Sequence, residues 1–223
     1  MKEFLLTATY LVGLGELILA GYFWKTHSGN EIRKVMAFLS LSTAGWTISN
    51  TYVAQFISEP VVTFELRVIH FFGIYIVSTL LHLSIIFPFK KRIFDGLHTL
   101  LFYVPSIIIS YIIFFTNAIT LGYVPQYLSG KTIGGSLFDL YNIYLTIYYF
   151  VAVIILFTKL KRSDGINRSN TILFLYAVLI SGIPAMVFNV WYALVDQVPS
   201  ALVGPLVSSI WLGITAYILI RKV

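Results

Sequence analysis

The 223-residue sequence has no cysteine and few charged residues. The missing cysteine excludes disulfides, thiolate metal ligands and thiol nucleophiles. Charged residues make up 11% of the chain, against about 25% in ordinary soluble domains. The sequence also lacks an HExxH zinc motif, a phosphate-binding glycine loop and a nucleophile motif. It therefore predicts no catalytic activity, no metal site and no cofactor.

Long hydrophobic runs dominate what is present. Hydrophobic residues make up 58% of the chain and the mean hydropathy is +0.88, more apolar surface than a core of this size can bury. The runs reach or nearly reach across a hydrocarbon core about 30 Å thick, and backbone groups in lipid must pair within their own segment. The fold class is therefore an all-α membrane protein. We expect one seven-transmembrane-helix bundle over residues 1–223, with helices at about 4–24, 35–58, 61–87, 97–115, 137–158, 171–192 and 200–220.

Basic residues predict the orientation of these helices. Only Lys2 and Lys131 lie in loops on one side, while alternate loops on the other side hold most of the lysine and arginine. Such loops face the cytoplasm, so the N-terminus is predicted outside, the C-terminus cytoplasmic and the chain multi-pass in the cell membrane. The net charge of +6 then indicates anionic lipid headgroups as a partner and no nucleic acid. The cytoplasmic set is Lys25, Arg33, Lys34, Lys90, Lys91, Arg92, Lys159, Lys161, Arg162, Arg168, Arg221 and Lys222.

One predicted outer loop is longer than the others. It covers residues 117–135 and is rich in Gly, Tyr and Pro. A loop of this length in a bundle is either a lid over a site or a mobile surface segment. The Ser136-x-x-Asp139 pattern after it resembles a capping box that opens the fifth helix.

Ionisable and polar residues inside the third run indicate a candidate site. At 100° per residue, Arg67, His70, Ser78 and His82 share one broad face of a helix, and Glu65 points nearly opposite. Such residues usually face the bundle interior or a wet cavity. One hypothesis is an outward-facing ligand pocket, and the alternative is a set of interfacial, snorkelling and aromatic-belt residues. The pocket would place Arg67 and His70 opposite Asp139, together with Asn50, Asn142, Asn189 and Trp191.

Two further features concern the other helices. Glu16 lies near the middle of the first run, where it is either a proton or cation site or a structural carboxyl that is protonated or bonded to Ser or Thr. Prolines at Pro105, Pro184 and Pro205 are predicted inside helices, where each would permit a kink.

Several stretches together carry a family resemblance. They are Ala44-Gly-Trp46, Glu65-Leu-Arg-Val-Ile-His-Phe-Phe-Gly73, Leu81-His-Leu-Ser-Ile-Ile-Phe-Pro88, Lys159-Leu-Lys-Arg162 and the final run from Pro199 to Arg221-Lys222. This set resembles the seven-helix N-terminal sensor region of bacterial and archaeal histidine kinases. The resemblance implies that the last helix continues into a cytoplasmic signalling domain. Since the sequence stops at Val223, that effector lies on a separate polypeptide or beyond this sequence.

Three functions remain open at this point. The first is a non-catalytic sensor that relays an outer-leaflet or extracellular signal to a cytoplasmic signalling protein or membrane-protein partner, with a homodimer as one arrangement. The second is a small-solute transporter, because Asn189-Val-Trp-Tyr and Pro199-Ser-Ala-Leu-Val-Gly204 faintly resemble SWEET-type sugar transporters. The third is an accessory subunit of a larger membrane complex. The residues do not identify a ligand or an oligomeric state.

Overall fold

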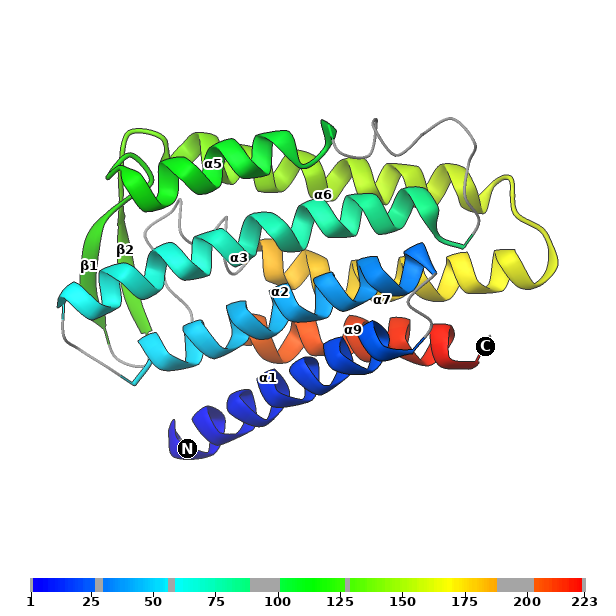
Figure 1. Cartoon of the computed structure of the whole chain (residues 1–223), viewed down its shortest axis with the longest axis horizontal. Helices are drawn as coiled ribbons and strands as arrows, with labels where there is room; N and C mark the ends of the chain where they lie inside the picture. The colour runs from blue at the N-terminus through cyan, green and yellow to red at the C-terminus, as the bar shows by residue number, and fades with distance from the viewer. Residues whose placement is uncertain are drawn as a thin grey trace.

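A computed structural model describes residues 2–26, 30–55, 59–88, 101–126, 129–187 and 203–221. This part of the chain is mostly helical, and each of the predicted hydrophobic runs contains a helix (Figure 1). The helices are α1 (Lys2–Lys25), α2 (Glu31–Val53), α3 (Glu59–Ile86), α5 (Val104–Phe115), α6 (Phe138–Leu160), α7 (Gly165–Met186) and α9 (Val203–Arg221). Two strands, β1 (Thr120–Gln126) and β2 (Ser129–Gly134), lie between α5 and α6.

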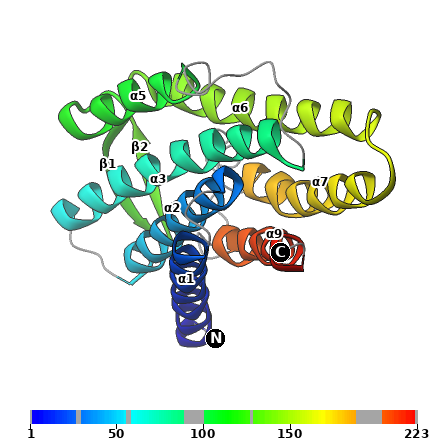
Figure 2. The same cartoon turned by 45° about the vertical axis from the view of Figure 1, so that its right-hand side comes forward.

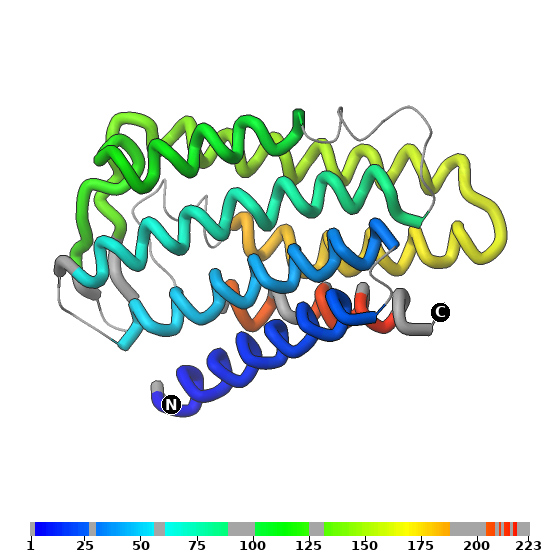
Figure 3. Tube along the Cα trace, in the orientation of Figure 1, coloured from blue at the N-terminus to red at the C-terminus, as the bar shows by residue number. Residues whose placement is uncertain are grey.

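The helices run side by side along the long axis of the molecule, and successive helices point in opposite directions (Figures 1 and 3). The α2 and α3 helices lie in the middle, with α1 at one margin and α5 and α6 at the other (Figure 2). The strands and the N-terminus lie at one end, which we name the hairpin end. The α6–α7 turn and the end of α9 lie at the opposite end, here named the basic end for its Lys161, Arg162 and Arg168.

Four of the described helices are long and apolar enough to cross a bilayer, namely α1, α3, α6 and α7. The α2 helix has a similar length but is rich in Ser and Thr, and 15 of its 23 residues are buried. Because α1, α3 and α9 all pack against it, its polar side chains face other helices. The α5 helix has 12 residues and spans only about 18 Å. Its predicted start at residue 97 lies outside the described residues.

The α2 helix begins four residues earlier than predicted and ends at Val53 instead of residue 58. Asn30 is its N-cap, and the Asn30 side chain accepts a hydrogen bond from the Ile32 backbone amide at 3.0 Å. Such a cap satisfies one of the free amides of the first turn. Arg33 and Lys34 therefore lie inside α2 and not in a loop, and Arg33 is buried.

The long outer loop folds into an antiparallel hairpin, so the all-α class was wrong in this detail. Strand pairing runs from Thr120–Gly134 to Gln126–Ser129. Tyr123 anchors the hairpin, because its buried ring belongs to a core cluster with Trp46 of α2 and with Val62 and Leu66 of α3. The predicted capping box was also wrong, since Leu137 is the N-cap of α6 and no side chain caps that helix.

The main hydrophobic core joins α2, α3, α6, α7 and α9 on the side of the basic end. Of the three prolines predicted inside helices, Pro184 lies in a helix interior. Pro105 belongs to the first turn of α5, and Pro205 is the third residue of α9. A proline in a first turn removes no intrahelical hydrogen bond, so neither residue produces the predicted kink.

The contact between α6 and α7 leaves no room for a side chain at Gly182. A Cβ atom there would lie 2.3 Å from Cε2 of Tyr149, and moving that ring would strain its hydrogen bond to the Val178 carbonyl. We predict that Gly182→Ala lowers the stability by about 1–3 kcal/mol, measured by thermal unfolding in detergent. Gly15→Ala is the control, because nothing lies within 4 Å of that position. Equal melting temperatures for the two variants would contradict this packing.

Candidate functional site

Polar residues on one face of α3 contact groups of α5, β1, α6 and α2. They are Arg67, His70, Ser78 and His82, the four residues predicted to share a face, and they span about 22 Å along the helix axis. Glu65 lies on the other side, within electrostatic range of Tyr10 on α1. We call these four residues and the side chains that bond them the α3 seam. The partners are Asn117, Thr120, Ser106, Tyr144 and Tyr103.

Arg67 begins the α3 seam at the hairpin end. Its Nη1 donates to the Phe114 carbonyl at 3.0 Å, and its Nη2 donates to the Asn117 side-chain oxygen. Phe114 lies in the last turn of α5, where carbonyls have no partner within their own helix. Asp139, predicted to lie opposite Arg67 and His70, is exposed in the first turn of α6, whereas Arg67 bonds to groups at the end of α5. Arg67 therefore holds the end of α5 against α3.

His70 ties α3 to the hairpin and to α6. Its Nδ1 lies 2.8 Å from the Thr120 hydroxyl at the start of β1. The Tyr141 hydroxyl donates to the His70 carbonyl at 3.2 Å, and the His70 ring meets the rings of Phe138 and Tyr141 edge to face. The two hydrogen bonds are buried, so a displacement of the hairpin would act directly on α3.

Three hydroxyls meet in the middle of the seam. Ser78 of α3 lies 2.7 Å from both Ser106 of α5 and Tyr144 of α6, and Ser106 lies 2.9 Å from Tyr144. Ser78 and Ser106 are fully buried. Without water, hydroxyls are costly to bury unless they bond one another. This hydroxyl triad therefore fixes the positions of three helices relative to one another.

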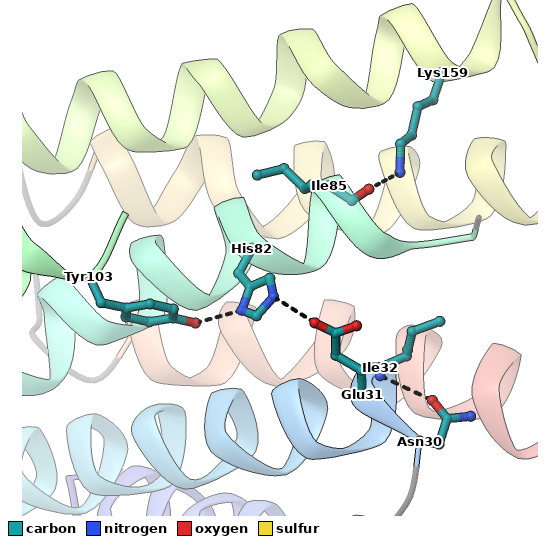
Figure 4. Close-up of polar contacts among 7 residues, drawn as sticks. All are labelled: Asn30, Glu31, Ile32, His82, Ile85, Tyr103 and Lys159. Atoms are coloured by element: carbon teal, nitrogen blue, oxygen red, sulfur yellow. Dashed lines mark hydrogen bonds and ion pairs between the residues drawn. The ribbon is translucent and has the colours of Figure 1, made fainter. Parts of the chain in front are cut away.

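Charged groups complete the seam toward the basic end (Figure 4). His82 Nδ1 lies 3.0 Å from the Tyr103 hydroxyl, and His82 Nε2 lies 3.7 Å from a carboxyl oxygen of Glu31 in the first turn of α2. Nearby, Lys159 is buried in the last turn of α6 and donates to the Ile85 and Phe87 carbonyls at 2.5 and 2.9 Å. The end of α3 is thus bonded to both α2 and α6. Lys159 was predicted as a loop residue, which was wrong.

The structure describes two of the other predicted site residues, Asn50 and Asn142, and neither side chain hydrogen-bonds to the seam. Asn50 is buried but donates to the Trp46 carbonyl within α2. Asn142 is buried in α6, and its amide nitrogen has no hydrogen-bond partner. Asn189 and Trp191 lie outside the described residues. No three His, Asp or Glu side chains converge in the part of the chain that the structure describes.

Several residues of the site escaped prediction from the sequence. Tyr141, Tyr144 and Tyr148 recur at spacings of three and four, which places them on one face of a helix. That spacing was a usable signal, but tyrosines near the ends of a span also suit the interface. Ser106 and Thr120 gave no signal, because single hydroxyl residues occur throughout membrane helices.

A model of the family described as the N-terminal 7TM region of histidine kinase matches residues 8–222. The match covers nearly the whole chain, including all of the α3 seam and both of its ends. No curated protein matches the chain.

The hydroxyl triad should couple α5 and α6 energetically, because Ser106 of α5 and Tyr144 of α6 contact each other. We expect Ser106→Ala and Tyr144→Phe to be non-additive in a double-mutant cycle, with a coupling of about 0.6 kcal/mol, a usual value between membrane helices. Unfolding by denaturant in mixed micelles measures each free energy. Tyr176→Phe is the matched control and should change nothing, because Tyr176 is 60% exposed on α7. Strict additivity of the two seam substitutions would show that the hydroxyls act independently.

Proposed function

This chain belongs to the family of the N-terminal 7TM region of histidine kinase, and on that premise we propose that it relays a signal from its hairpin end to a partner at its basic end. The family is the non-catalytic input part of these kinases, a multi-pass membrane sensor module. The observation that carries the proposal is the α3 seam, a series of buried and partly buried polar contacts that extends along α3 from the hairpin end toward the basic end.

The proposed input site is formed by α3, α5, α6 and the hairpin. A ligand or a change in the bilayer that displaces the hairpin would act on His70 through Thr120, and on the packing of Tyr123 against α2 and α3. Arg67 and His70 remain the candidate ligand contacts from the predicted set. Asp139 is exposed at the start of α6, next to Phe138, whose ring packs against His70, and it could meet a ligand from the solvent side.

The proposed output is a shift of α9 relative to its neighbours. This helix packs mainly against α7 and less extensively against α1 and α2. Movement of α3 would reach α2 at Glu31 and α6 at Lys159, and from there α9 by way of α2 or α7. Such a relay requires two packings that the signal favours differently.

We propose that the basic end faces the cytoplasm. Lys161, Arg162 and Arg168 are exposed around the α6–α7 turn, at the end of the molecule where α9 finishes (Figure 1). Positively charged loops are retained on the cytoplasmic side, where anionic headgroups attract them. The end of α9 would then meet a cytoplasmic signalling partner.

The relay can be tested by measuring the distance between α7 and α9. The chain has no cysteine, so cysteines introduced at the exposed positions Tyr176 and Ile210 accept spin labels selectively. We expect His70→Ala, which removes the bond to Thr120, to shift or broaden the distance distribution between the labels in lipid nanodiscs. A free energy of 1–3 kcal/mol is typical for such coupling.

Glu65→Ala is the matched control for this measurement. Glu65 lies on the same helix about one turn from His70, but it faces α1 and makes no seam contact. The distribution should match that of the unmodified labelled protein. If His70→Ala also leaves the distribution unchanged, the α3 seam does not control α9 and the relay is wrong.

A further inference from the structure

Glu16 is a buried carboxyl that the α3 seam does not use. It lies in α1, only 3% exposed, and neither of its carboxyl oxygens has a hydrogen-bond partner. The neighbouring polar group is the Thr47 hydroxyl on α2, which is also fully buried and without a hydrogen bond of its own. The Thr47 hydroxyl is thus the polar group that faces this carboxyl between α1 and α2.

The helices approach closely at this level. A Cβ atom on Gly13, one turn from Glu16, would lie 2.7 Å from Cγ1 of Ile48 and 3.4 Å from Cγ2 of Thr47. This close contact leaves little space for water beside the carboxyl. A carboxylate ionised in such a place would be costly, because neither water nor a cation would stabilise its charge.

Among the described residues, no fixed positive charge lies near Glu16 on a helix that packs against α1. The nearest cation along α1 is Lys25, about 14 Å away by residue count. On α2 and α9, which both contact α1, the ionisable residues cluster toward the helix ends and include no base near the level of Glu16. They are Glu31, Arg33, Lys34 and Tyr52 on α2, and Tyr217 and Arg221 on α9.

The ligand that fits this site is a proton. A hard metal cation takes about six or more oxygen ligands, whereas the described side chains offer the two carboxyl oxygens and one hydroxyl. We propose that Glu16 is a proton-binding site between α1 and α2, and that loss of this proton loosens the packing of α1. The proposal does not depend on the relay to α9, because it concerns the α1–α2 contact alone.

Labelling of the unmodified protein tests the site directly. Dicyclohexylcarbodiimide is an apolar reagent that adds to protonated carboxyls, and mass spectrometry locates the adduct. We expect an adduct on the peptide with Glu16 in lipid nanodiscs at acidic pH, and a progressive loss of that adduct as the pH rises. Glu3 is the internal control, since it is exposed in the first turn of the same helix and should not be labelled at neutral pH. No adduct at any pH, or an adduct that does not vary with pH, would overturn the proposal.

A stability measurement tests the consequence for packing. The melting temperature of the wild type should fall with rising pH relative to Glu16→Gln, because the amide has the same shape but cannot ionise. The melting temperature of Glu3→Gln should change with pH as that of the wild type does. Equal pH profiles for the wild type and Glu16→Gln would overturn the proposed effect on packing. Replacing choline chloride with sodium chloride at fixed pH should leave the melting temperatures of the wild type and Glu16→Gln unchanged. A melting temperature that rises in sodium chloride for the wild type alone would identify Na⁺ as the ligand and exclude the proton.

Discussion

Polar groups inside a membrane bundle have little water to bind, so a stable bundle pairs them within their own helix or with a neighbouring element. The arrangement of α3 follows from this constraint. Arg67, His70, Ser78 and His82 lie on one side of it, and each contacts a polar group of α5, the hairpin, α6 or α2. Hydrophobic contacts alone are weakly directional in lipid. The hydrogen bonds therefore determine which helices lie beside α3 and how far along its axis each one contacts it.

The same constraint divides the basic residues into two groups. Lys161, Arg162 and Arg168 are exposed and suited to headgroups, whereas Arg33 and Lys159 are buried at helix ends. Lys159 donates to carbonyls at the end of α3, which would otherwise lack partners. The count of lysine and arginine that predicted the orientation does not distinguish the exposed group from the buried group. Two members of the predicted cytoplasmic set, Arg33 and Lys159, are therefore packed inside the bundle.

Much of the helical architecture could be predicted, because hydrophobic runs and the period of 3.6 residues are local properties of the sequence. The prediction that the polar residues of α3 share one face was correct for this reason. The start of α2 was missed because charged residues precede its apolar run, although Asn30 followed by Glu31 is a usable capping signal. The hairpin was missed because its tyrosine and glycines suited a loop equally well. The pairing of Arg67 with Phe114 and Asn117 depends on where α5 ends, which no local pattern contains.

The relay depends on the orientation of the α3 seam across the membrane, with the hairpin end outside and the basic end in the cytoplasm. Single cysteines in this cysteine-free chain test it most directly, at Leu121 in the hairpin and at Lys161 beside the α6–α7 turn, both exposed positions. A membrane-impermeant maleimide applied to intact cells should label the cysteine at Leu121, and should label that at Lys161 only after the membrane is opened. Labelling of both positions from the outside, or the reverse pattern, would contradict the proposed orientation and the direction of the relay.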